Sequence, residues 1–177
     1  MNGQTTLGLA APIFYGPVQP ELDQIPDPAA GGGFTIEVGA NYYERPIALS
    51  FTFTTAAHAA TRQVQLQLLD PGGVLVAAMP VASTQITTLT YQYSFVAQLS
   101  SPQAVAANVV ISPLPAWVIP SSYSLAVTIT NVYTTDQVTN IRYYRDRFST
   151  DPYDYVIGGV ATDTAERAVR RFEAVTG

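Results

Sequence analysis

The single histidine of this chain, His58, is the first residue whose type could support catalysis. A general base needs an orienting partner and a nucleophile within hydrogen-bond reach. His58 lies among small residues, in the run TTAAHAAT, and the sequence has no Gly-x-Ser-x-Gly elbow or comparable signature. One imidazole also supplies too few ligands for a transition-metal site. We therefore expect His58 to have a structural or incidental role.

Three aspartates, Asp146, Asp151 and Asp154, form the second candidate because they cluster within nine residues. Calcium needs only oxygen ligands, and a glycosidase needs only two carboxylates about 5 to 9 Å apart. These aspartates alternate with arginines and tyrosines, however, and lack the D-x-D-x-D-G spacing of a calcium loop. We expect a solvated or interface loop with internal Arg–Asp pairs. Glu37 and Glu44 flank a predicted turn, and both are expected at the surface.

Composition argues against several other classes of chemistry. The chain has no cysteine, which excludes disulfides, thiolate catalysis and zinc–thiolate sites. Charged residues make up only 12% of it, against roughly 25% in an average soluble domain, and the net charge is −5. No dense basic stripe is present, so we do not expect a nucleic-acid partner. We expect no enzyme activity and no metal or other cofactor.

Neither a membrane span nor a secretory signal is expected. No apolar run approaches the ~18 residues that a spanning helix needs. The N-terminal apolar run lacks a preceding basic segment and is interrupted by Pro12. We therefore expect synthesis and folding in a cytoplasm.

Tyrosine and arginine stand out in the sequence, and both are favoured in protein–protein interfaces. The chain has 11 tyrosines, several of them in pairs, and most of its arginines follow residue 141. Adjacent residues on a strand point to opposite faces, so one of Tyr143 and Tyr144 must leave the core. A packed loop is the alternative interpretation of this region. The residues that we expect in an interface are Phe14, Tyr15, Tyr144, Arg145, Arg147, Phe148, Tyr153, Tyr155 and Phe172.

These residues need a scaffold, and the N-terminal segment is not expected to provide it. Residues 1–33 contain five prolines and end in Gly31-Gly32-Gly33, a poor basis for a helix or a continuous sheet. Their apolar residues distinguish the segment from a disordered tail. We expect an extended arm that lies along a surface, either its own or a neighbour's. Because the chain has no lysine, sheet edges must also be covered by other means, such as this arm or a partner's strand.

From Phe34 onward the hydrophobic period becomes two, which indicates half-buried strands separated by turns. The turn Asp70-Pro71-Gly72-Gly73 between two such runs is typical of a hairpin. About eight strands at this spacing predict an all-β domain over 34–145, an antiparallel sandwich or jelly roll. The expected strands lie at 34–38, 47–54, 64–68, 74–79, 89–95, 108–112, 123–130 and 141–143.

The only tryptophan, Trp117, is surrounded by Pro113, Pro115 and Pro120. Because proline cannot donate a ladder hydrogen bond, we expect a loop over 113–121 that crosses one end of the sandwich. Trp117 is expected to cap that end, since a large indole is mostly buried. The alternative is an exposed tryptophan that binds a ligand.

The last segment, 146–177, is expected to be an interface loop followed by one short helix. Asp163 and Glu166 have the spacing of an N-cap and its reciprocal partner. An apolar stripe follows at helical spacing, and the flanking arginines suit the C-terminal end of the helix dipole. At about twelve residues the helix needs a partner surface, which is either its own chain or another subunit. The stripe consists of Ala165, Ala168, Val169, Phe172 and Val175.

A proline-rich loop, an alternating strand and a polar turn leading into a second strand follow one another over 113–145. The characteristic runs are Ile119-Pro120-Ser121-Ser122-Tyr123-Ser124-Leu125 and Asp136-Gln137-Val138-Thr139-Asn140-Ile141-Arg142. This order resembles a C-terminal hairpin of small virion proteins of tailed bacteriophages. The resemblance implies a β-sandwich component of a capsid decoration, collar or head-to-tail region. The chain departs from the pattern by continuing into a Tyr/Asp/Arg loop and a helix, which leaves the virion position open.

The leading hypothesis is a structural virion protein that assembles through its arm, tail and sheet surfaces. The expected partners are copies of itself and other virion proteins, such as major capsid or portal and connector proteins. Many symmetric copies would allow modest individual contacts to suffice. The alternative is a carbohydrate-binding β-sandwich, in which Trp117 and exposed tyrosines form a stacking platform for a glycan. A glycan-cleaving enzyme has the least support of the three.

Overall fold

The structure is a computed structural model that describes residues 15–150, apart from the side chains of residues 15–17 and 103–106. These residues form ten β-strands. None of them belongs to a helix with the length and apolar character needed to span a bilayer. The strands are β1 (Tyr15–Ile25), β2 (Phe34–Glu37), β3 (Tyr42–Thr54), β4 (Arg62–Leu69), β5 (Leu75–Gln85), β6 (Thr90–Ala97), β7 (Gln103–Ala106), β8 (Val109–Leu114), β9 (Ser124–Thr130) and β10 (Gln137–Ser149).

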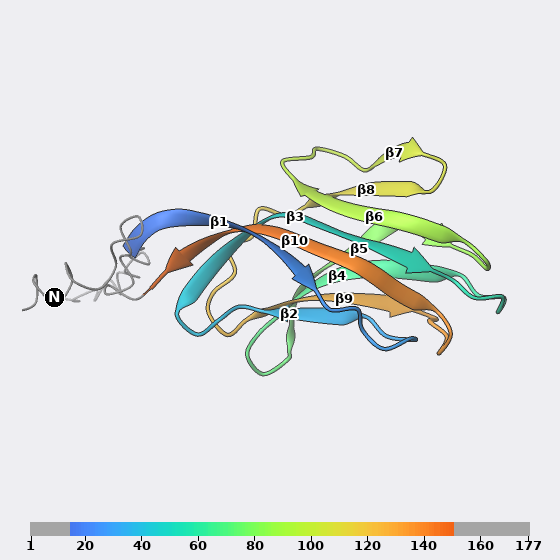
Figure 1. Ribbon diagram of the computed structural model, residues 1–177, viewed down its shortest axis with the longest axis horizontal. Helices are drawn as coiled ribbons and strands as arrows, with labels where there is room; N and C mark the ends of the chain where they lie inside the picture. The colour runs from blue at the N-terminus through green and yellow to red at the C-terminus, as the bar shows by residue number, and fades with distance from the viewer. Residues whose placement is uncertain (1–14, 151–177) are drawn as a thin grey trace, which may run out of the picture.

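The strands form two sheets that pack face to face as a β-sandwich (Figure 1). The six-stranded sheet has the order β1-β10-β3-β6-β8-β7, and the four-stranded sheet has the order β2-β9-β4-β5. The pairs are antiparallel except for β6 and β8, which run parallel. The predicted all-β class and sandwich arrangement are therefore confirmed for the described residues.

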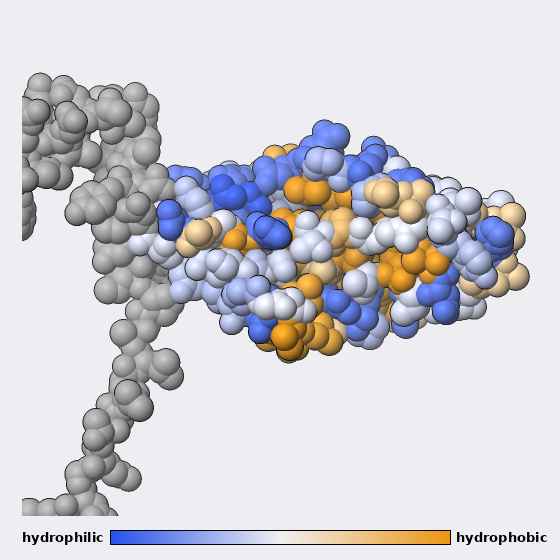
Figure 2. Space-filling view, turned by 90° about the horizontal axis from the view of Figure 1, so that it is seen from below, coloured by the Kyte–Doolittle hydropathy of each residue, from blue (hydrophilic) through white to orange (hydrophobic). Residues whose placement is uncertain are grey.

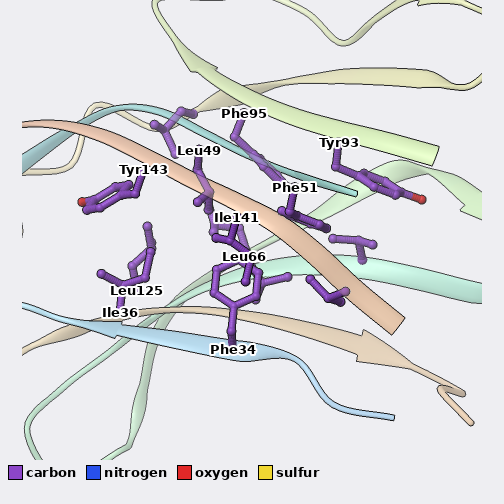
Figure 3. Packing of buried hydrophobic residues seen from close by; sticks show 14 of the residues in the cluster. Phe34, Ile36, Leu49, Phe51, Leu66, Tyr93, Phe95, Leu125, Ile141 and Tyr143 are labelled. Atoms are coloured by element: carbon purple, nitrogen blue, oxygen red, sulfur yellow. The ribbon is translucent and has the colours of Figure 1, made fainter. Parts of the chain in front are cut away.

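The hydrophobic core lies between the two sheets (Figure 3). Phe51 of β3 meets Phe34 of β2 edge to face, with ring centroids 5.4 Å apart, and it stacks on Tyr93 of β6 at 5.4 Å. Aromatic pairs in these geometries add to the stabilisation that burial of apolar area provides. Further members of the core are Ile36, Leu49, Leu66, Phe95, Leu125, Ile141 and Tyr143.

All eight predicted strands are present. The predicted alternation is most regular in the burial of β2, β4 and β8. Two strands, β1 and β7, were not predicted from the sequence. Strands β3, β5 and β10 are also several residues longer than predicted.

The prediction of an arm without continuous sheet over 1–33 is wrong for residues 15–25. They form β1, which pairs with β10 at the edge of the six-stranded sheet. Pro17 lies at a register irregularity and Pro20 lies on this edge strand, and both are positions at which a sheet tolerates proline. The predicted domain boundary at residue 33 therefore falls inside the sandwich.

The connection between β1 and β2 lies close against the turn between β9 and β10. The amide of Gly31 donates to the carbonyl of Asp136 at 2.8 Å, and the side-chain amide of Gln137 donates to the carbonyl of Pro28 at 3.0 Å. A Cβ atom at Gly33 would lie 1.9 Å from the carbonyl oxygen of Val127. Only glycine fits at position 33, so Gly33 is required for the packing of this connection against β9.

A bulge in β3 changes which of its side chains face the core. Tyr144 of β10 pairs with Ala48 but Arg145 pairs with Pro46, so Ile47 is an extra residue. Glu44 and Pro46 are consequently buried on the same side as the core residues that follow. Strict alternation would have placed Glu44 outside. The expectation of a surface position for Glu44 is therefore wrong.

Strand β10 has a bulge of its own and continues beyond the predicted boundary. Asn140, at φ 56°, is the extra residue between Thr139 and Arg142. The strand then runs to Ser149, so residues 146–149 are paired sheet and not the start of an interface loop. The remainder of the predicted loop and the predicted C-terminal helix lie outside the described residues.

A buried ion pair fixes the end of the sandwich where β4 and β10 begin. Arg62 Nε donates to Asp136 Oδ2 at 2.9 Å, and neither side chain is exposed. The Arg62 guanidinium also donates to the carbonyls of His58 and Ala60. It lies over the ring of Tyr133, on which His58 stacks with centroids 4.5 Å apart. The contacts of His58 thus agree with a structural role.

The predicted loop around Trp117 begins later than expected, because β8 continues to Leu114. Pro113 lies beyond the last β8 residue that pairs with β7, an edge position that tolerates proline. Trp117 is partly buried and packs against the core, as expected of a cap. Ile119 and Glu44 exchange two backbone hydrogen bonds, of 2.7 and 3.0 Å, which attach the loop to β3.

Candidate interaction surface

The predicted interface residues that the structure describes lie mainly on β10. The side chain of Tyr144 is on the outer face of the six-stranded sheet and is 38% exposed. Arg145 is buried, and Arg147 and Phe148 are partly buried. Tyr15 is the first residue of β1 and lies opposite Ser149, and its side chain is not described. Four residues lie outside the described residues, namely Phe14, Tyr153, Tyr155 and Phe172.

The register of the six-stranded sheet brings five apolar side chains into one line. Leu22 of β1 lies opposite Tyr144 of β10, which lies opposite Ala48 of β3. Ala48 lies opposite Val96 of β6, which lies opposite Pro113 of β8. Residues that lie directly opposite one another point to the same face of a sheet. These five residues are called the apolar row below.

The apolar row faces outward, because the chain neighbours Tyr143, Leu49 and Phe95 point into the core. Leu22 is 69% exposed and Tyr144 is 38% exposed, and the other three members are partly exposed. Polar residues lie on both sides of it. Gln24, Arg142, Ser50 and Ser94 form the next register line on one side, which ends at Ile111 of β8. Pro20, Asp146 and Arg45 form the line on the other side, where Asp146 and Arg45 are an ion pair. The row is therefore an apolar strip across five strands whose neighbours on β10, β3 and β6 are polar.

The four-stranded sheet presents no comparable row on its outer face. The register line of Thr35, Ala126, Gln67 and Ala78 mixes polar with small residues. The exposed apolar residues Val74, Leu75 and Val76 gather at the β4–β5 hairpin, and the register line of Leu75 continues through Leu69 to the polar Ser124 and Glu37. Figure 2 views the molecule from below, the side on which Figure 1 places β2, β9 and β4, and shows apolar residues in separate patches among polar ones. Among the described residues, the outer face of the six-stranded sheet thus offers the better surface for a flat partner.

On the inner side of the same strands, charged residues form a network that we call the Arg145 cluster. Its members are Glu21 and Asp23 of β1, Glu44 of β3, and Arg145 and Arg147 of β10. The Arg145 guanidinium lies 3.0 Å from Glu21, 2.6 Å from Asp23 and 3.2 Å from Glu44. Arg147 lies 3.0 Å from Glu21 and 3.2 Å from Glu44. Each arginine therefore connects β1 to β3 across β10.

Burial controls the electrostatics of the Arg145 cluster. Burial raises the pKa of Glu44 above its usual value, and attraction to Arg145 and Arg147 only partly offsets this. The hydroxyl of Tyr143 donates to Glu44 at 3.5 Å, and burial also raises the pKa of that phenol. Burial lowers the pKa of Arg145, but its carboxylate partners raise it further, so the pKa lies above its usual value.

The Arg145 cluster bears on one of the predicted interface residues. Arg145 is only 5% exposed, and its guanidinium pairs with carboxylates of its own chain. Its carboxylate neighbours are already hydrogen-bonded by guanidinium groups, which suits them to holding strands together. Within residues 15–150 there is no group of three ligating side chains that could hold a metal ion.

Asp146, one of the three aspartates considered for calcium, pairs with Arg45 on the outer face. This agrees with the expectation of an internal Arg–Asp pair. Asp151 and Asp154 lie outside the described residues. Arg45 also lies over the ring of Phe148, 5.8 Å from its centroid, so Phe148 has a contact within the chain.

Sequence reasoning missed four members of the apolar row and three of the Arg145 cluster. Leu22 was assigned to an arm, and Ala48, Val96 and Pro113 carry no signal until the strand register is known. Glu44 was placed on the surface because nothing in the sequence marks the bulge at Ile47. The one usable signal was Glu21 and Asp23, whose spacing of two suits one face of a strand.

No protein-family model matches the sequence, and no curated protein is significantly similar to it.

Proposed function

We propose that this chain is a structural assembly protein that associates with copies of itself through the outer face of its six-stranded sheet. The observation that carries the proposal is the apolar row, from Leu22 on the sheet edge to Pro113 on the fifth strand. An apolar strip that is bounded by polar residues is typical of a protein-interaction site. The proposed partners extend to other virion proteins, such as capsid, portal or connector proteins.

A second copy is the favoured first partner because little charge would oppose the contact. Residues 71–135 contain no Asp, Glu, Lys or Arg. On the outer face of the six-stranded sheet, Asp146 and Arg45 form an ion pair with each other, and Arg142 is the further charge beside the apolar row, where it donates to Gln24. Two copies that meet on this face would therefore bring few like charges together. Burial of one Leu or Tyr contributes only about 1.5–3 kcal/mol, so stable assembly would depend on many symmetric contacts.

The proposed setting is the virion of a tailed bacteriophage, as a decoration, collar or head-to-tail component. The support for this setting is the resemblance of the segment 113–145 to a hairpin of small virion proteins. The arrangement as a β-sandwich is compatible with it. Antibody labelling tests this setting and the position within the virion. An antibody against the protein should label particles purified from the source culture. Labelling of cell material alone would refute the setting.

Light scattering of the full-length protein over a range of concentrations tests self-association. We expect oligomers, and we expect Leu22→Glu and Tyr144→Glu each to weaken association at least about tenfold because a charge must then be desolvated in the contact. Ile86→Glu is the matched control, since Ile86 is 57% exposed and is not part of the apolar row. Equal behaviour of all variants, or a monomer throughout, would contradict the proposal.

The same samples distinguish the alternative function. A strict monomer that binds a glycan would favour the carbohydrate-binding hypothesis. Trp117 gives that hypothesis little support, because its indole packs against the core and is partly buried. A truncation of residues 1–33 cannot be used to test whether the N-terminal segment mediates association, because it would also remove the edge strand β1.

A further inference from the structure

Strand β1 is attached to the sandwich in a different way from the other long strands. Among the β1 side chains that the structure describes, those of residues 18–25, only Ile25 packs against the hydrophobic core, and it does so partly buried. Val18 and Leu22 are exposed on the outer face, 46% and 69% respectively. Glu21 and Asp23 point inward, but into the Arg145 cluster. The strand is therefore held by its backbone ladder with β10 and by polar contacts, with little apolar burial.

In the polar contacts between the two strands, basic side chains of β10 pair with acceptor side chains of β1. Arg142 of β10 donates to Gln24, Arg145 pairs with Glu21 and Asp23, and Arg147 pairs with Glu21. Three arginines of β10 thus pair with two carboxylates and one amide of β1. The acids are partly exposed, at 29% and 40% of their side chains, so salt can screen these pairs.

We propose that β1 is an exchangeable strand, which leaves the β10 edge of its own chain and pairs with the β10 edge of a second copy. The acceptor edge selects an extended segment with two acids two residues apart. The β1 strand of a second copy has this sequence by identity, so every ion pair and ladder hydrogen bond can re-form between chains. Exchange of an identical element is a low-cost route to association. The inference rests on the proposed self-association, since exchange needs copies that meet.

The connection after β1 sets the geometry of the exchange. From Gly31 onward the chain is fixed by the hydrogen bond to Asp136 and by the close fit of Gly33 against Val127. The hinge is therefore residues 26–30, which can span at most about 17 Å once the hydrogen bonds of Asp27 to Asn140 and of Pro28 to Gln137 are broken. The acceptor edge must begin within that distance of Gly31. Two copies would thus meet near the first residues of their β10 strands, at the end of the sandwich that holds the Arg62–Asp136 pair.

Cysteine trapping tests the exchange on a clean background, because the chain has no cysteine. Gln24 and Arg142 lie opposite each other, and both are exposed and outside the apolar row. Opposite residues in antiparallel strands have Cα atoms about 4.5–5.5 Å apart, within the range that a disulfide spans. Full-length Gln24→Cys and Arg142→Cys proteins are mixed, incubated and oxidised mildly. We expect a mixed disulfide dimer, identified by mass spectrometry of the joined peptides.

Three controls make the result specific. The double variant Gln24→Cys/Arg142→Cys should close within one chain when oxidised before mixing, and it should then form no mixed dimer. Thr35→Cys, exposed on the other sheet, should not be joined to Gln24→Cys. Adding Glu21→Gln and Asp23→Asn should speed exchange on the order of tenfold, because three partly exposed ion pairs are removed. Glu37→Gln, an exposed charge outside the cluster, should leave the rate unchanged.

The outcomes separate this inference from the proposed function. Oligomers without the mixed disulfide, or with only Gln24→Cys or only Arg142→Cys homodimers, would overturn strand exchange and leave face-to-face association standing. A mixed disulfide together with association that is unaffected by Leu22→Glu or Tyr144→Glu would support exchange and refute assembly through the apolar row.

Discussion

The substitution Asp136→Asn should be among the most destabilising single changes that the structure offers. Asp136 Oδ2 accepts from Arg62 Nε and from the amide of Tyr133, each at 2.9 Å. Its Oδ1 accepts from the amide of Ala56 at 2.7 Å and from Arg62 Nη2 at 3.1 Å. Asparagine offers one acceptor oxygen and turns an NH₂ group toward the donors that the second oxygen served. Arg62, with no exposed side-chain surface, would also lose its counter-charge.

The expected loss in the free energy of unfolding is about 3–5 kcal/mol, the usual cost of removing one partner from a buried ion pair. At a denaturant sensitivity of about 2 kcal/mol per molar urea, the unfolding midpoint should fall by about 2 M. Asp70→Asn is the matched control, because Asp70 accepts two backbone amides at 2.8 Å in an exposed hairpin turn. Its cost should stay near 1 kcal/mol.

The pH dependence provides a second, independent check on Asp136. Burial alone would raise its pKa, but hydrogen bonds from the amides of Tyr133 and Ala56 and from Arg62 outweigh burial and lower the pKa. The stabilisation is therefore complete above the unfolded-state pKa near 4 and is lost as the pH falls through the lower folded-state pKa. The gap between wild type and Asp136→Asn should narrow below about pH 4.

Two results would refute this reasoning about Asp136. One is a loss at pH 7 no larger than that of Asp70→Asn. The other is a gap that stays constant between pH 7 and pH 3. The double variant Arg62→Met/Asp136→Leu should recover part of the loss, because it removes both charges from the interior together. Urea titrations followed by tyrosine and tryptophan fluorescence measure all four proteins.

Three further predictions concern single residues. Gly33→Ala should lower the free energy of unfolding by about 3 kcal/mol or more, because its Cβ would overlap the carbonyl oxygen of Val127. Gly73→Ala should lower it by only about 1–2 kcal/mol, because position 73 has a φ of 78° but open space around it. Thermal unfolding of both variants measures the difference. The pKa of Glu44 is raised in the folded state, so its ionisation makes the wild-type protein less stable as the pH rises. The urea midpoint of Glu44→Gln should therefore increase relative to that of wild type between pH 4.5 and pH 7. A difference in midpoints that does not change with pH would contradict this. Asn140→Gly should be nearly neutral and Asn140→Val should cost about 1–2 kcal/mol in urea unfolding, because φ at this bulge is 56°.

The sequence predicted the strands that form the core, because burial on one face imposes a period of two that can be read directly. Phe34 with Ile36 and Leu125 with Val127 are examples in which the pattern and the burial agree. The arm was misread for a physical reason: prolines oppose a central strand but not an irregular edge strand. Among residues 18–25 of β1, only Ile25 packs against the core, so this part of the strand has almost no hydrophobic period to detect.

The candidate surface could not be predicted in the same way, since it depends on register between strands distant in sequence. Ala48 and Val96 have no distinctive type, and they join Tyr144 in one row only through two separate pairings. A single bulge at Ile47 likewise exchanged the faces of Glu44 and Arg45. One inserted residue exchanges the inward-facing and outward-facing side chains on one side of the bulge, and counting apolar residues along the sequence does not detect it.

The run Asp136 to Arg142, one of the two on which the proposed virion setting rests, has a structural role within this chain. Asp136 closes the buried ion pair, Gln137 holds the carbonyl of Pro28, Asn140 forms the bulge, and Arg142 holds Gln24. All four act within the chain, and all four are hydrogen-bonded to β1 or its connection, Asp136 through Gly31 and Asn140 through Asp27. A protein that shares this run is therefore expected to share the docking of its N-terminal strand on β10. The apolar row has no member in the run, so partner choice can differ between proteins that share this framework.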